Sequence, residues 1–122
     1  MNEGKDSKYY DLEDRTFKFA KDVRNFIKLL SKTISNIEDG KQVIRSSGSV
    51  GANYIEANES ISRKDFFLRI KICRKEAKES KFWLLLIDIS SNKELGGEQK
   101  RLVNEAIELM KIFSSIMRSS EK

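Results

Sequence analysis

Apolar residues recur three and four positions apart along most of the chain, which is the pattern of amphipathic α-helices. The chain contains no proline, and its clearest breaks are Asp39-Gly40, a Ser/Asn-rich stretch from Asn58 to Ser62, and Gly96-Gly97. Three breaks predict four helices. Consecutive helices joined by short connections usually pack antiparallel. The sequence therefore predicts an all-α fold, an antiparallel up-down four-helix bundle.

The first predicted helix runs from about Leu12 to Ile34, because the apolar residues between them keep the helical spacing. The second carries a face of small residues that includes Gly48 and Gly51. A glycine inside a helix costs about 1 kcal/mol relative to alanine. These glycines therefore indicate that a neighbouring backbone approaches closely. The alternative is that the second helix begins only after Gly48.

The third predicted helix begins at Ser62-x-x-Asp65, where a serine N-cap precedes a carboxylate near the positive end of the helix. It extends to about Ile89. Its apolar and small residues form one unbroken row that is expected to face the core. That row consists of Phe66, Ile70, Cys73, Ala77, Ser80, Leu84 and Ile87.

The fourth predicted helix runs from about Glu98 to Ser119, and apolar residues cover more of its circumference than a bundle core needs. Such coverage indicates either a thick core or an oligomer interface, and we favour the interface. Residues 1–11 carry no periodic pattern and are predicted to be a flexible N-terminal tail. Residues 12–119 are then one four-helix bundle domain.

The composition excludes several functional classes. The chain has 122 residues, of which 39% are hydrophobic, and this suits one domain with one core. It contains no histidine and one cysteine, so the commonest general base, a disulfide and a zinc thiolate cluster are all excluded. We expect no catalysis, no cofactor and no metal. The longest apolar run, Phe82 to Ile87, is too short to cross a membrane, so we expect a cytoplasmic protein.

Positive charge is concentrated on the third predicted helix. The chain has a formal net charge of +5, and residues 61–81 carry eight basic against three acidic side chains. On a helix, Lys71, Lys75 and Lys78 fall on one stripe, with Arg74 and Lys81 adjacent. This favours a polyanionic partner; the alternative is a solvated helix face. The candidate nucleic-acid-binding residues are Arg45, Lys64, Lys71, Arg74, Lys75, Lys78 and Lys81.

Other polar and reactive residues have structural interpretations. Cys73 lies in the apolar row with no histidine to activate it, so we expect a packed core thiol. Glu56, Glu76 and Glu79 are the only candidates for a carboxylate site, and Glu76 and Glu79 are expected to pair with Arg or Lys side chains. A polar strip on the second helix indicates a hydrogen-bonded packing seam or, alternatively, part of a contact surface. The strip consists of Gln42, Ser46, Ser49 and Asn53.

Three stretches of sequence resemble a known family. They are Ile44 to Ala57, followed by Ser62 to Phe66, and then Lys75 to Leu84 on the third helix. Their order and spacing are similar to the bundle proteins encoded in intervening sequences of bacterial large-subunit ribosomal RNA genes. This chain has Ile55-Glu56-Ala57 where the commonest family form has alanine-glutamate-glycine. The residues that carry the resemblance are Arg45, Ser49, Asn53, Glu56, Ser62, Lys64 and Phe66.

The resemblance implies an up-down bundle that assembles as a homopentamer without known catalysis, and a link to RNA through gene location. Related bundles are accessory proteins of the reverse transcriptases of diversity-generating retroelements. We therefore expect a non-enzymatic oligomeric bundle that binds structured RNA or an RNA–protein complex through its basic helix. The alternative is an oligomeric scaffold that binds a partner protein such as a reverse transcriptase. A peripheral membrane helix is disfavoured, because the core requires the third helix's apolar row.

Overall fold

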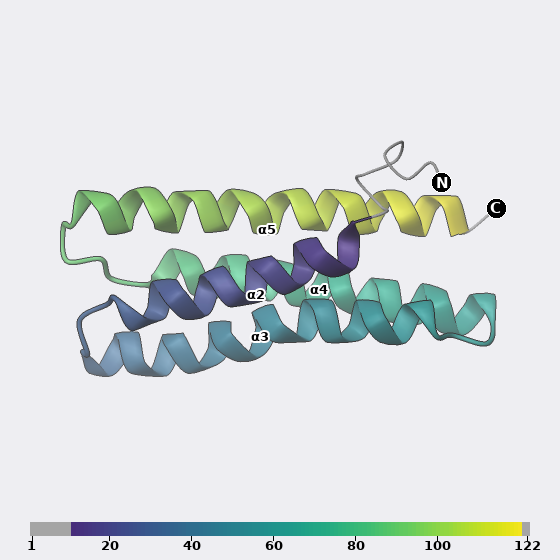
Figure 1. Ribbon diagram of the computed structural model, residues 1–122, viewed down its shortest axis with the longest axis horizontal. Helices are drawn as coiled ribbons and strands as arrows, with labels where there is room; N and C mark the ends of the chain where they lie inside the picture. Colours follow the sequence, from purple (N-terminus) through teal and green to yellow (C-terminus); the bar gives the residue numbers. More distant parts are fainter. Residues whose placement is uncertain (1–10, 121–122) are drawn as a thin grey trace.

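The computed structural model describes residues 11–120, and this part of the chain contains four α-helices and no β-strand. The chain runs up and down through them, so that neighbours in sequence are antiparallel neighbours in space (Figure 1). The most extensive packing is between α3 and α4 and between α4 and α5, whereas α2 covers α3 and α5 from one side. The predicted all-α four-helix bundle is confirmed. The helices are α2 (Leu12–Lys28), α3 (Ile34–Asn58), α4 (Arg63–Leu86) and α5 (Lys93–Ser120).

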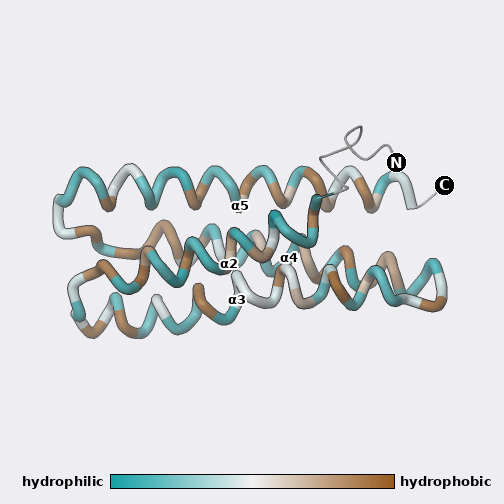
Figure 2. The backbone as a smooth tube through the Cα atoms, viewed as in Figure 1, coloured by the Kyte–Doolittle hydropathy of each residue, from teal (hydrophilic) through white to brown (hydrophobic). Residues whose placement is uncertain are grey.

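The core lies where the apolar stripes of the four helices meet. Hydrophobic residues alternate with hydrophilic ones along each helix, as the tube in Figure 2 shows. In the row predicted for the third helix, every member from Ile70 to Ile87 is buried, and Phe66 packs against the core as a partly buried residue. The periodicity therefore gave the correct inner face of α4. The largest fully buried side chains include Phe19, Phe26, Phe113, Leu12, Ile70, Leu84, Leu102 and Leu109.

The first predicted break, at Asp39-Gly40, is wrong. The structure ends α2 at Lys28 and begins α3 at Ile34, which is 84% exposed and does not extend the stripe of α2. Thr33 is the N-cap, and its hydroxyl accepts a hydrogen bond from the Asn36 N–H. Gly40 is buried inside α3, where a Cβ would lie 3.3 Å from Cγ2 of Ile27. That glycine allows α2 and α3 to pack closely and does not end a helix.

The break predicted at Gly96-Gly97 is also wrong, since both glycines lie inside α5. The connection spans residues 87–92, where Ser90 and Ser91 take left-handed backbone angles, with φ of 55° and 61°. The helix α4 accordingly ends at Leu86 and not at Ile89. The Asn92 side chain accepts a hydrogen bond from the Leu95 N–H at 3.0 Å, which supports the first turn of α5.

The helix α3 continues through Gly48 and Gly51, so the alternative start after Gly48 is wrong. A Cβ on Gly51 would lie 2.9 Å from the Thr16 hydroxyl oxygen and 3.6 Å from the Thr16 backbone carbon. The close backbone approach that the glycines indicated is therefore found at Gly51. At Gly48 the neighbour is the Arg24 guanidinium group, which lies 3.3 Å from the position a Cβ would take.

The broad apolar face of α5 belongs largely to the core of a single bundle, which corrects our preference for an oligomer interface on this helix. Of its predicted apolar residues, Ile107, Met110 and Ile116 are partly buried against the core and the others are buried. The large hydrophobic residues that remain exposed lie instead on α2, α3, α4 and the turns. They are Phe17, Leu29, Ile34, Ile37, Ile55, Ile61, Leu68, Phe82, Leu85 and Leu86.

Ion pairs hold α2 against α5. The Arg15 guanidinium group donates two hydrogen bonds, of 2.7 and 2.8 Å, to the Glu105 carboxylate, and Arg101 donates to Asp22 at 3.0 Å. The predicted tail, residues 1–11, lies outside the described residues except for Asp11, which precedes α2 as its N-cap. Within residues 11–120, no helix combines the length and the apolar character needed to span a membrane.

Candidate nucleic-acid interface

The outer face of α4 carries a stripe of exposed lysines and apolar residues. Because α3 and α5 pack on the inner side of α4, residues spaced three and four apart on the opposite side remain in solvent. All members of this stripe are exposed. We call it the outer stripe, and it consists of Lys64, Leu68, Lys71, Lys75, Lys78, Phe82 and Leu85.

Three of the stripe's lysines carry uncompensated charge. Among residues 11–120, no carboxylate lies within ion-pair distance of Lys64, Lys71 or Lys78. Their ammonium groups are therefore available to an anion without first breaking an internal pair. Three of the seven predicted site residues thus lie on one exposed line with charges that no acidic side chain of residues 11–120 neutralises, which suits them to binding phosphate groups.

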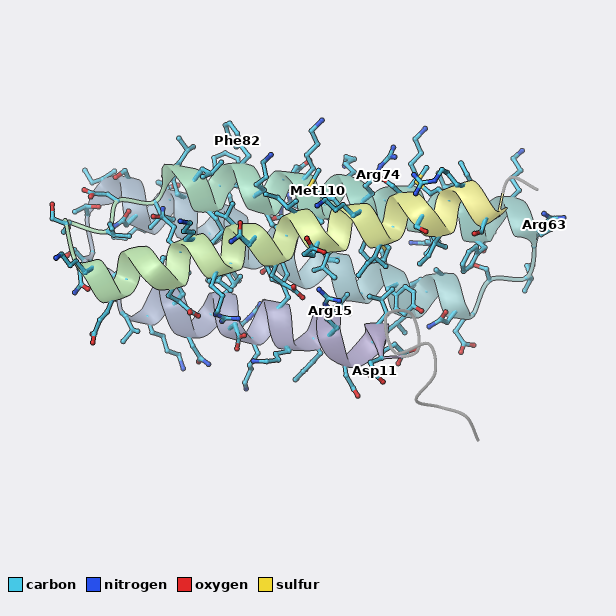
Figure 3. The ribbon with its side chains drawn as sticks, turned by 90° about the horizontal axis from the view of Figure 1, so that it is seen from above. Asp11, Arg15, Arg63, Arg74, Phe82 and Met110 are labelled. Atoms are coloured by element: carbon cyan, nitrogen blue, oxygen red, sulfur yellow. The ribbon has the colours of Figure 1, made fainter. Side chains whose placement is uncertain are left out.

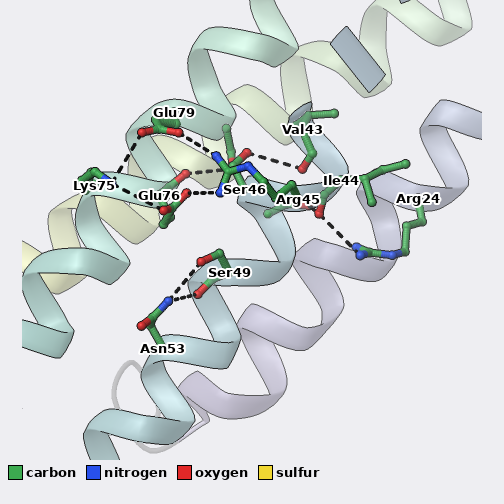
Figure 4. A network of polar contacts seen from close by, with 12 residues as sticks. Arg24, Val43, Ile44, Arg45, Ser46, Ser49, Asn53, Lys75, Glu76 and Glu79 are labelled. Carbon is green, nitrogen blue, oxygen red and sulfur yellow. Dashed lines mark hydrogen bonds and ion pairs between the residues drawn. The ribbon is translucent and has the colours of Figure 1, made fainter. Parts of the chain in front are cut away.

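Lys75 and Arg45 are in a different electrostatic state, because both pair with acidic residues of α4 (Figure 4). Arg45, on α3, donates a hydrogen bond of 2.9 Å to Glu79 and lies 3.5 Å from Glu76 Oε1. The Lys75 ammonium nitrogen lies 3.6 Å from Glu76 Oε2 and 3.8 Å from Glu79 Oε2. The predicted pairing of these two glutamates with basic residues is confirmed. Two positive and two negative charges form a locally neutral group.

Glu76 is the buried member of this group. Its residue is 6% exposed, and its Oε1 accepts no hydrogen bond from any group that the structure describes, although Arg45 lies at ion-pair distance. A buried carboxylate is costly without a compensating charge. Arg45 and Lys75 therefore have a structural task, which is to neutralise Glu76 at the α3–α4 boundary.

The polar strip of α3 forms the adjacent packing seam. The hydroxyl groups of Ser46 and Ser80 are buried and lie 2.8 Å apart in a hydrogen bond between α3 and α4. The Asn53 amide donates to both the backbone oxygen and the hydroxyl of Ser49, and its own oxygen accepts from Arg69 at 3.0 Å. The hydrogen-bonded seam is thus the correct interpretation for these residues, whereas Gln42 is exposed.

Arg74 and Lys81 lie at the edge of the outer stripe. Arg74 is partly buried and donates a hydrogen bond of 3.4 Å to the Ser114 hydroxyl of α5. In Figure 3, Arg74 and Phe82 lie on the same side of the bundle, away from Asp11 and Arg15 of α2. Lys81 is partly buried as well. Both residues flank the three uncompensated lysines.

The thiol and carboxylate candidates lie apart in residues 11–120. Cys73 is fully buried, and burial raises the pKa of its thiol to about 12, which makes it a poor nucleophile. Within the described part of the chain, no three carboxylate or thiol groups form a cluster that could hold a metal ion. Glu56 is exposed.

A second surface feature is an apolar groove between α2 and α3, with a volume of about 380 Å³. Its exposed rims are Phe17, which is 69% exposed, and Ile55, which is 51% exposed. Gly48 and Gly51 of α3 contribute to the lining. Arg24 lines the groove and donates a hydrogen bond to the Ala20 carbonyl oxygen. We call this feature the α2–α3 groove.

The comparisons with known proteins place the fold and sequence in one family. The sequence profile of the 23S rRNA-intervening sequence proteins matches residues 8–115, which is most of the chain. The chain belongs to this family. A solved structure of a protein of unknown function from the S23 ribosomal protein family, from Bacteroides thetaiotaomicron, is similar to this chain with a TM-score of 0.72 and 30% identity. The match covers 87% of this chain and 97% of that one. A comparison with curated proteins gave no match.

For this member of the 23S rRNA-intervening sequence protein family, sequence reasoning missed the apolar part of the outer stripe. Leu68, Phe82 and Leu85 are each more than half exposed. They follow the same spacing of three and four residues that places Lys71 and Lys78 on one line. The spacing alone therefore predicts that they share a helix face with these lysines. These three residues lie outside the row predicted to face the core, and the structure shows that they are exposed beside the lysines.

Proposed function

We propose that this protein is a non-enzymatic, oligomeric helical-bundle protein that binds nucleic acid through the outer face of α4. The ligand is structured RNA or an RNA–protein complex. The observation that supports this most is the line of exposed Lys64, Lys71 and Lys78 with no acidic partner among residues 11–120. Lysine ammonium groups in a row suit a phosphate backbone, because each phosphate contact releases condensed counterions.

The seven candidate residues contribute to different degrees. Lys64, Lys71 and Lys78 are the principal phosphate contacts, with Arg74 and Lys81 at the edge of the stripe. Arg45 and Lys75 pair with Glu76 and Glu79, so a phosphate group has to compete with carboxylates for them. We expect their contribution to RNA affinity to be smaller.

The family name supports an RNA partner and a cytoplasmic location. The family is that of 23S rRNA-intervening sequence proteins, so its members are linked by name to a ribosomal RNA, which is found in the cytoplasm. The proposal includes no catalytic role, because the chain has no histidine and the Cys73 thiol is buried. It requires neither a cofactor nor a metal.

The α2–α3 groove supports assembly with a second copy of the chain. Exposed apolar residues such as Phe17 and Ile55 are typical of protein contacts when they rim a groove. Assembly, with five copies as the family resemblance implies, repeats the lysine line and increases the avidity of weak contacts. Light scattering should give a multiple of 14.1 kDa in dilute buffer. A mass of one chain at all concentrations would contradict the oligomer.

The second candidate function is a scaffold that binds a partner protein, such as the reverse transcriptase of a diversity-generating retroelement. The same groove favours it, because its rims are the exposed apolar side chains of Phe17 and Ile55. The two functions differ in how RNA binding depends on salt. The proposed function predicts a linear fall of log affinity with log salt, with a slope of about 0.7 to 0.9 per phosphate contact. No salt-dependent RNA binding by the wild-type chain would favour the scaffold.

A further inference from the structure

Phe82 is an aromatic ring on the outside of the bundle. It is 56% exposed, and in Figure 3 it points away from the helices on the face opposite α2. Its ring packs edge-on against Trp83, with centroids 5.0 Å apart and planes at 78°. Because this contact supports the ring from one side, Phe82 is positioned without being buried. A supported but exposed ring is available for stacking.

The surroundings of the ring are cationic. Lys78 lies four residues before Phe82 on the same stripe, and Lys81 is its neighbour in sequence. Lys71 lies two turns further toward the N-terminus of α4, where one turn is about 5.4 Å. A ligand that covers Phe82 therefore meets Lys78 and Lys71 along the same helix face, and it has to offer negative charge together with a flat apolar surface.

Single-stranded RNA offers both features. Its phosphates are anionic, and each unpaired base has a face that stacks on aromatic side chains. In a duplex the base faces are occupied by neighbouring pairs, and A-form RNA is contacted through its backbone and shallow groove. A duplex would therefore bind the lysines and leave the Phe82 ring unused.

We infer that the outer stripe binds unpaired segments of RNA, with a base stacked on Phe82 and adjacent phosphates on Lys78 and Lys71. This inference rests on the proposed function, since it specifies which form of RNA the same surface recognises. The stripe distinguishes loops or single strands from duplex through one aromatic residue and binds phosphates through its lysines.

The test compares an unstructured single-stranded RNA with a duplex of matched length, each titrated against the full-length protein. Phe82→Leu keeps an apolar side chain but removes the aromatic face, whereas Phe82→Tyr keeps the face. Loss of one stacked base should lower single-strand affinity about tenfold in Phe82→Leu. Phe82→Tyr should stay within about twofold of wild type. Duplex affinity and the salt slope should be unchanged in both variants, because the phosphate contacts remain.

Trp83 provides a second measurement, since it is the only tryptophan in the chain and contacts Phe82. Its fluorescence should change when single-stranded RNA binds and stay constant when the duplex binds. Leu29→Ala is the matched control, because Leu29 is aliphatic and 68% exposed and lies at the end of α2, outside the outer stripe. It should leave single-strand affinity within about twofold of wild type.

Three results would overturn the inference. Unchanged single-strand affinity in Phe82→Leu would show that no base stacks on the ring, while the proposed function would stand if binding still fell with salt. A changed oligomeric mass in Phe82→Leu by light scattering would show that the ring contacts another copy. Absence of salt-dependent binding to either RNA by the wild type would remove the proposed function itself, and this inference with it.

Discussion

The inner face of α4 carries small and apolar side chains that pack against α3 and α5, whereas its outer face carries lysines interspersed with exposed apolar residues. On the inner face, Ile70, Cys73 and Ala77 are fully buried. On the outer face, Lys71 and Lys78 are exposed and lack acidic partners among the described residues. Both faces follow the same helical periodicity, so one sequence segment specifies core packing and a cationic surface together.

This difference teaches that stability and binding can be changed separately on one helix. A substitution on the inner face alters packing in a core with little room to adjust. A substitution on the outer face changes surface charge, which has a small effect on stability. A substitution of Lys75 has both kinds of effect. Its side chain is exposed, but it also helps to neutralise the buried carboxylate of Glu76.

The largest expected effect is that of Ala77→Glu, which places a carboxylate in the inner row. Ala77 is fully buried, and an unpaired buried charge should cost several kcal/mol, comparable to the stability of a small domain. We expect loss of the cooperative thermal transition measured by circular dichroism. Lys78→Glu, one residue away on the outer face, is the control and should melt close to wild type. A wild-type melt for Ala77→Glu would show that the inner face of α4 is misassigned.

A smaller effect is expected for Cys73→Ala, because the substitution removes one buried sulfur atom. The free energy of unfolding near pH 7 should fall by about 1 kcal/mol, and RNA binding should be unchanged. Loss of binding in a still-folded variant would make Cys73 a functional residue.

The same variant has a distinct alkaline signature. Burial raises the pKa of the Cys73 thiol from 9.0 to about 12, so between these values the unfolded chain loses a proton that the folded chain keeps. Stability must then fall as pH rises through this window. Wild type should lose more stability than Cys73→Ala between pH 9 and pH 12, as measured by denaturant unfolding. Parallel curves for the two proteins would contradict the burial of the thiol.

The helical rows and several helix boundaries, among them the start of α2 at Leu12 and the end of α5, were predictable from the sequence. The residues of a helix that face the core are mostly apolar and recur every three or four positions. The inner row of α4 could therefore be identified from the apolar pattern of the sequence. The start of α4 was also correct, because Ser62 is a strong N-cap whose hydroxyl accepts a hydrogen bond from the Asp65 N–H.

The boundaries placed at Asp39-Gly40 and Gly96-Gly97 were wrong, because glycine has two structural uses. Gly40 and Gly96 lie inside helices, where a Cβ would approach Ile27 and Ile89, and they indicate close packing. The true starts of α3 and α5 are signalled by Thr33 and Asn92, whose side chains accept hydrogen bonds in the first turn. Helix-capping residues were better boundary signals here than glycines.

In the candidate site, the line of lysines was predictable, and its electrostatic state was predictable in part. The spacing placed Lys71, Lys75 and Lys78 on one stripe. The contribution of Arg45, a residue 30 positions before Lys75 in the chain, depends on how α3 packs against α4. The Lys75–Glu79 pair, at positions i and i+4 of α4, follows from the local pattern, whereas the pairs that Arg45 forms with Glu76 and Glu79 do not.

The smallest expected effect on stability, and the largest on binding, is that of replacing Lys71, Lys75 and Lys78 together by glutamine. The three side chains are exposed, and Arg45 still pairs with Glu76 and Glu79 when Lys75 is replaced, so the variant should stay folded and keep its oligomeric mass. A variant with Lys28, Lys93 and Lys100 replaced by glutamine is the matched control, because it loses the same charge from exposed positions outside the outer stripe and the α2–α3 groove.

The most direct measurement of the central claim is the slope of log RNA affinity against log salt for wild type, the outer-stripe variant and its control. We predict that the outer-stripe variant binds every RNA more weakly and has a flatter slope, because each lost phosphate contact removes about 0.7 to 0.9 from it. Sequence preference should hardly change, since phosphates carry no base information. The control should retain most of the wild-type slope. A folded, oligomeric outer-stripe variant with wild-type affinity and slope would contradict an RNA site on α4.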